Sequence, residues 1–84
     1  MEDKNDLALF VSYQIFTSLI QILFREVNHK GNKEYKKALF AIAIAREKGE
    51  TINDFFLENP HIFKKICEVE AVREYFARHL KEEE

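Results

Sequence analysis

The sequence has few of the residues that interrupt or cross-link a chain: one proline, two glycines, one cysteine and no tryptophan among 84 residues. The single cysteine, Cys67, excludes an internal disulfide and is typical of a reducing compartment, so a cytoplasmic location is expected. With so little proline and glycine there is little room for linkers. We therefore expect a single helical domain over residues 1–84, with residues 1–5 and 82–84 frayed.

A strong charge of one sign and a long apolar run are also missing. The formal net charge is -2, which gives no global attraction to nucleic acid or acidic lipid. The most apolar segment, residues 7–24, is interrupted by serine, threonine and glutamine, whereas a membrane span needs about 20 predominantly apolar residues. The acidic start of the chain lacks the positive region of a signal peptide. No membrane insertion is expected.

Apolar residues, by contrast, are plentiful, at 46% of the chain with eight phenylalanines and three tyrosines. Wound as a helix at roughly 100° per residue, residues 7–24 are apolar over nearly two thirds of the circumference, which is more than packing on one core requires. We expect one side to meet residues 38–45 and a later apolar stripe, and the other side to meet a second copy of the chain.

The expected homodimer interface combines that surplus arc with a second apolar cluster. Residues 55–57 are three consecutive large apolar residues on a short helix, and they cannot all face one core. The predicted interface residues are Ile15, Phe16, Leu19, Ile22, Phe56 and Leu57.

Local signals divide the chain into helices. Asn5 or Asp6 can cap the first helix, and Gly31 follows its end. A second helix should begin near Asn32 or Lys33 and stop before Gly49. Its centre, residues 38–45, is apolar all round and is expected to be buried on several sides.

Two further helices follow. Thr51 and Asp54 resemble a capping box that opens a short helix over residues 52–58. Asn59 and Pro60 then begin a last helix, with proline at its first position. The prediction is an all-α bundle of three long helices and one short helix.

The last helix carries one apolar stripe. Its members follow one another at steps of three, four and seven residues: Ile62, Ile66, Val69, Phe76 and Leu80. Arg73 lies on the same line, so its head group should reach the edge of the core or a carboxylate across an interface. A kink between Cys67 and Glu70 is compatible with the pattern.

Basic residues gather around the first connection, in what we call the basic turn. Its members are Arg25, His29, Lys30, Lys33, Lys36 and Lys37, opposed only by Glu26 and Glu34. Lysines at the start of a helix are disfavoured by the helix dipole, so helix stability does not explain them. They could face nucleic-acid phosphate, pair with acidic residues of another subunit, or simply be solvated.

The second connection has part of a helix-turn-helix pattern. Ala45, Gly49, Ile52 and Phe55 have the spacing of that motif within residues 38–58. Lys48, Glu50 and Glu58, however, stand where apolar residues are usual. A recognition helix here would bring acidic residues towards phosphate. The alternative is that the spacing arises by coincidence, because two helices are joined through a glycine.

Motifs for catalysis are sparse. The histidines, acidic residues and Cys67 have no metal-binding spacing, and the chain has neither a glycine-rich phosphate loop nor a nucleophile with its base. Arg73 and His79 have the Arg-x(4–6)-His spacing of HEPN-type helical ribonucleases, and the resemblance ends there. Six residues along one helix place the two side chains well apart in angle, so no role is transferred. No catalytic, cofactor or metal site is expected.

These observations favour a non-enzymatic helical module for protein-protein interaction or regulation, acting as a homodimer and open to a second protein partner. The alternative is a small nucleic-acid-binding regulator that uses the basic turn, residues 25–37, or the degenerate helix-turn-helix, residues 38–58. A third possibility is a subunit that is unstable outside a larger complex.

Overall fold

The computed structural model describes the backbone of residues 2–79 and the side chains of residues 9–79. Within those limits the chain is helical and has no strand. In chain order its elements are α1 (Glu2–Asn28), the 3-10 helix η1 (Lys33–Tyr35), α2 (Lys36–Lys48), α3 (Ile52–Glu58), α4 (Pro60–Ile66) and α5 (Glu70–His79). The all-α class is confirmed. The predicted three long helices and one short helix are wrong, because two long helices are followed by three short ones.

Helix α1 begins earlier than its expected cap. It is helical from Glu2, whereas the expected cap is Asn5 or Asp6. The expected fraying of residues 1–5 stays a prediction, and residues 82–84 lie outside the described part. Acidic residues at Glu2 and Asp3 suit the positive end of the helix dipole. At the other end Gly31 has φ +76°, the left-handed conformation that glycine adopts most readily after a helix.

Helix α2 follows the 3-10 turn and ends where expected. Gly49 has φ +77°, and its N–H donates to the carbonyls of Ala45 and Arg46. Ala38, Leu39, Ile42 and Ala45 are buried. The prediction that this helix is buried on several sides is wrong for its far side, because Phe40 and Ile44 are more than half exposed in the described part of the chain.

Helix α3 matches its sequence prediction closely. The Thr51 hydroxyl accepts the N–H of Asp54 at 3.2 Å, as in a capping box. Pro60 is at the first position of α4. Asn59 does not cap α4 with its side chain, because its amide donates instead to the carbonyl of Phe55 at 2.9 Å.

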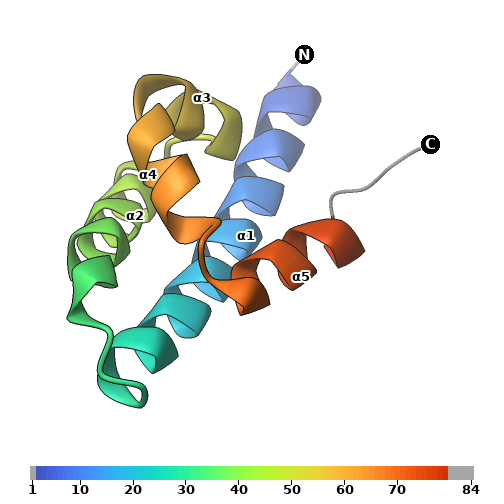
Figure 1. Ribbon diagram of the computed structural model, residues 1–84. Coiled ribbons are helices and arrows are strands. Elements are labelled where there is room, and N and C mark those ends of the chain that lie inside the picture. The colour runs from blue at the N-terminus through green and yellow to red at the C-terminus, as the bar shows by residue number, and fades with distance from the viewer. Residues whose placement is uncertain (1, 80–84) are drawn as a thin grey trace.

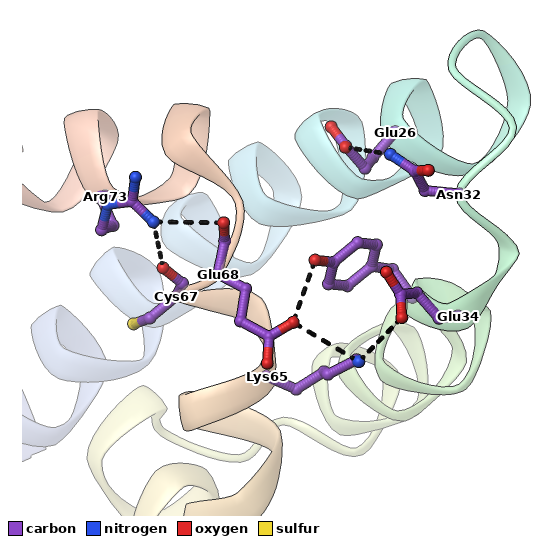
Figure 2. A network of polar contacts seen from close by, with 8 residues as sticks. Glu26, Asn32, Glu34, Lys65, Cys67, Glu68 and Arg73 are labelled. Carbon is purple, nitrogen blue, oxygen red and sulfur yellow. Dashed lines mark hydrogen bonds and ion pairs between the residues drawn. The ribbon is translucent and has the colours of Figure 1, made fainter.

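The predicted last helix is divided into α4 and α5, and the division lies between Cys67 and Glu70, where the sequence pattern allows a kink. Arg73 Nη1 donates to the carbonyl oxygens of Cys67 at 2.8 Å and Glu68 at 3.1 Å, which stabilises the tight turn between the helices (Figure 2). Arg73 therefore does not reach a carboxylate across an interface. The change of direction lets Ile66 on α4 and Val72 on α5 both be fully buried. Leu80, the last member of the stripe, lies outside the described residues.

The helices form two layers. Helices α1 and α2 are an antiparallel pair; α4 packs against α2, and α3 and α5 pack against α1 (Figure 1). The turn between α1 and α2 lies at one end of this pair, and α3 lies at the other, beside the first turns of α1. One core fills the space between the layers. Its buried apolar residues are Ile15, Phe16, Leu19, Leu23, Val27, Tyr35, Ala38, Leu39, Ile42, Ala45, Phe55, Ile66, Val69 and Val72.

Among the helices of the described chain, none has the length and apolar character needed to cross a membrane.

Candidate functional site

The side of α1 that faces away from the core carries a regular apolar stripe. Phe10, Tyr13, Thr17, Ile20 and Phe24 recur at alternating steps of three and four residues, the spacing of a helix-helix seam. Phe10, Tyr13 and Phe24 are each more than half exposed. This stripe has the pattern of a packing surface, yet among the described residues these three rings stay more than half exposed.

Helix α2 has exposed apolar side chains of its own. Arg46 marks the side of α2 that faces α1, because its Nη1 donates to the Thr17 hydroxyl at 3.1 Å and its guanidinium lies 5.2 Å from the centre of the Tyr13 ring. Further round the helix come Ala43, Phe40 and Ile44, of which Phe40 is 58% and Ile44 55% exposed. We call the α1 stripe together with Phe40, Ala43 and Ile44 the outer face.

The outer face replaces most of the predicted dimer interface. Ile15, Phe16 and Leu19 are at most 5% exposed, because α2, α3 and α5 close over them within the single chain. The prediction that a second subunit covers these residues is wrong: they are the chain's own core. Ile22 is partly buried at the edge of the same core. The surplus apolar arc of α1 exists, but on another side of the helix, and one of its members, Ile20, lies at the edge of the core.

The other predicted interface residues lie at an aromatic corner formed by α3 and α4. Phe56 is partly buried, with its ring centre 4.8 Å from that of Phe63 and 6.4 Å from that of Phe76. Leu57 is 78% exposed. An open hollow of about 520 Å³ is lined by Asn53, Phe56, Leu57, Pro60 and Phe63. Of the predicted interface residues, Leu57 is thus the most accessible.

The basic turn is assembled as the sequence suggests. All six of its residues are exposed at the end of the α1–α2 pair. Lys30 lies 3.7 Å from Glu26, whose other oxygen accepts a hydrogen bond from Asn32 (Figure 2). Among the described side chains, no carboxylate lies within ion-pair distance of Lys33, Lys36 or Lys37.

The second acidic residue near the basic turn belongs to a polar network that ties η1 to α4. Lys65 Nζ lies 3.2 Å from Glu34 and 3.4 Å from Glu68, and the Tyr35 hydroxyl donates to Glu68 at 3.1 Å. Figure 2 shows Lys65 between the two carboxylates. Burial, and then the hydrogen bond to Glu68, raises the pKa of Tyr35 above its ordinary value. The hydrogen bond to Glu34 is the largest cause that raises the pKa of Lys65.

These raised values predict a loss of stability in alkali. A group whose pKa is raised by folding stabilises the fold below its ordinary pKa, 10.0 for tyrosine, and loses that contribution as the pH passes the folded value. We expect Tyr35→Phe to cost about 1 kcal/mol at neutral pH and to flatten the decline above about pH 10. Urea unfolding across the alkaline range would measure both effects. Tyr13→Phe is the control, and identical pH profiles for the two variants would contradict the prediction.

The helix-turn-helix positions are only partly suited to that motif. Ala45 and Phe55 are buried and Gly49 makes the turn, as the motif requires. Helix α3, however, has only seven residues, none of them basic. It exposes Asp54 and Glu58, whose carboxylates would repel phosphate.

The described side chains hold little that could carry out chemistry. No three His, Cys, Asp or Glu residues among them lie close enough together to hold a metal ion. Burial raises the pKa of the Cys67 thiol, opposed in part by Arg73, so the thiolate is disfavoured. Arg73 is engaged with two carbonyls, and His79 lies against the Tyr75 ring with 4.6 Å between ring centres.

Comparison of the chain with protein-family models, with curated proteins and with solved structures finds no match. The outer face, the aromatic corner and the basic turn therefore carry the functional argument by themselves.

Proposed function

We propose that the chain is a non-enzymatic, cytoplasmic interaction module that acts as a homodimer. One observation carries the proposal: among the side chains of residues 9–79, fourteen apolar residues fill the core and nine other large apolar residues are exposed. Single exposed apolar residues are common in proteins, but a row of aromatic rings along one helix is typical of a surface that another chain covers.

The distribution of these residues favours self-association over an enzymatic role. Five of the nine lie on the outer face: Phe10, Tyr13, Phe24, Phe40 and Ile44. A small domain that must bury more apolar surface than its own core can hold does so most simply by pairing with a second copy.

The proposal predicts a mass that depends on concentration. Sedimentation or light scattering from the low micromolar to the high micromolar range should show a shift from the 10.0 kDa chain towards twice that mass. Circular dichroism at each concentration controls for unfolding. A monomer throughout the range would contradict the proposed function, and large aggregates in place of a defined dimer would favour an orphan subunit.

A second candidate function rests on the exposure of all six basic residues at one end of the α1–α2 pair. Such a cluster suits nucleic-acid phosphate, and binding would weaken steeply with salt. Duplex binding at low salt that is lost in Lys33→Gln/Lys36→Gln/Lys37→Gln would favour this candidate. The acidic residues of α3 and the net charge of -2 make it the weaker one.

A further inference from the structure

The two ends of the α1–α2 pair differ in charge. The end with the basic turn has six basic residues. Glu26 there is engaged with Lys30 and Asn32, and Glu34 with Lys65, while Glu70 and Glu74 line a hollow beside Lys30. Lys33, Lys36 and Lys37 have no acidic residue within ion-pair distance among the described side chains. Lys33 begins η1 and Lys36 and Lys37 begin α2, where the helix dipole disfavours lysine, so helix stability does not explain them.

The opposite end is acidic. The first two turns of α1 contain Glu2, Asp3 and Asp6 against Lys4, and the end of α2 with α3 contributes four more acidic residues. The four are Glu47, Glu50, Asp54 and Glu58. The basic residues here are Arg46, which donates to Thr17 and lies 3.9 Å from Glu47, and Lys48.

Between these ends the outer face presents few charges. Its α1 stripe runs from Phe10 to Phe24 with Thr17, a small residue, at the midpoint. A two-fold axis near Thr17 would place Phe10 of one copy opposite Phe24 of the other, and the two helices could approach closely at the threonines. The same rotation would set each basic turn beside the acidic end of its partner. In an antiparallel pair each basic end meets an acidic end and the apolar centres meet each other, whereas in a parallel pair ends of like charge would meet. The surface is therefore complementary to a second copy only in the antiparallel orientation.

From this charge pattern we infer that the occupant of the outer face is a second copy of this chain, packed antiparallel so that each basic turn faces the acidic end of the other copy. The inference rests on the proposed homodimer and assigns its interface and orientation. The first turns of α1, with Asp3 and Asp6, then lie across from the turn that holds Lys33.

The size of the outer face limits the expected affinity of the dimer. Phe10 and Phe24 are about 21 Å apart along the helix, and two helices side by side are about 20 Å wide. A face of this size is at the low end for specific interfaces, which bury about 800 Å² per partner. We therefore expect a dimer that dissociates on dilution in the micromolar range and weakens as salt screens its ends.

The interface is tested first with apolar-to-acidic substitutions. Phe24→Asp and Phe40→Asp alter side chains that are more than half exposed, so the fold should survive while the dissociation constant rises at least tenfold. Leu57→Asp is the matched control at the aromatic corner, and it should leave self-association unchanged. A dimer that resists both outer-face changes but is lost in Leu57→Asp would overturn the inference and leave the proposed function standing.

The orientation is tested by exchanging charges between the two ends. One variant carries Lys33→Glu, Lys36→Glu and Lys37→Glu, and the other carries Asp3→Lys, Asp6→Lys and Glu47→Lys. Each alone should self-associate at least tenfold more weakly, because both of its ends then have the same sign. Mixed together they should form a heterodimer, since both end contacts are again between opposite charges.

The outcomes of this exchange separate the alternatives. The mixed pair has opposite charges at both ends in either orientation, so the single variants decide the orientation. In a parallel dimer like ends already meet in the wild type, and neither variant alone would self-associate more weakly than the wild type. Unchanged self-association in both single variants would therefore overturn the inferred antiparallel orientation and the role of the charged ends. A monomeric wild type would remove the proposed function itself. If the variant with Lys33→Glu, Lys36→Glu and Lys37→Glu lost duplex binding without any change in self-association, these lysines would be nucleic-acid contacts instead.

Discussion

Leu19→Asp is expected to unfold the chain at every concentration. Leu19 is fully buried on the inner side of α1, where Ser12 is the only buried polar residue among the described ones and its hydroxyl already accepts the N–H of Ile52. The cost of burying an unpaired charge exceeds about 4 kcal/mol, and a domain of this size is stable by only about 4–13 kcal/mol in total. Far-UV circular dichroism and thermal unfolding would show the loss of helix.

Two substitutions on the same helix serve as controls for Leu19→Asp. Gln21→Asp, on an exposed residue, should change stability by no more than about 0.5 kcal/mol. Phe24→Asp should remain folded and lose only self-association. A Leu19→Asp protein that is monomeric but fully helical would contradict the placement of this residue in the core, and would restore the interface predicted from the sequence.

Phe55→Ala is expected to cost about 3–5 kcal/mol, the second largest loss. Phe55 is 4% exposed, and its ring meets Phe16 edge-to-face with 5.7 Å between centres. Helix α3 has seven residues and depends on this contact and on the Ser12 hydroxyl, which accepts the N–H of Ile52 at 2.8 Å. Without the ring, α3 loses most of its attachment to α1.

Urea unfolding would measure the effect of Phe55→Ala through the shift in midpoint at constant slope. Leu57→Ala is the matched control, two residues further along α3 and 78% exposed, and it should change stability by about 0.5 kcal/mol or less. Similar losses of stability in the two variants would show that α3 also packs through the side that carries Leu57. A change of slope in Phe55→Ala would indicate that α3 detaches before the rest unfolds.

Local signals located α3 well because its ends are determined by neighbouring residues. Thr51 caps within three residues, Gly49 turns the chain immediately before, and Pro60 begins the next helix. Such interactions are contained in a short stretch of sequence, so spacing and residue type are enough to predict them.

The pattern allows a kink between Cys67 and Glu70, where α4 and α5 separate, but no local signal requires it. No glycine or proline marks it, and the apolar stripe continues through it. Arg73 stabilises the turn by donating to carbonyl oxygens five and six residues before it, and burial of Ile66 and Val72 in one core stabilises the change of direction. The stabilisation from this burial depends on the positions of α1 and α2, which cannot be deduced from a local sequence pattern.

The exposed side of α1 is the clearest case for the candidate site. Its apolar arc covers nearly two thirds of the helix, so Leu19 and Phe24 look alike in the sequence. Leu19 is buried because α2, α3 and α5 converge on its side, whereas the ring of Phe24 is more than half exposed.

The sequence by itself determined the helical class, most helix boundaries, the position of the basic turn and the presence of more apolar surface than one core needs. These depend on composition and on contacts within a few residues. Only the tertiary structure decided which side of α1 is core, where the last helix bends, and that Phe10, Tyr13, Phe24, Phe40 and Ile44 share the outer face. The physical reason is that burial depends on segments distant in sequence packing on the same helix, and periodicity cannot say from which side they come.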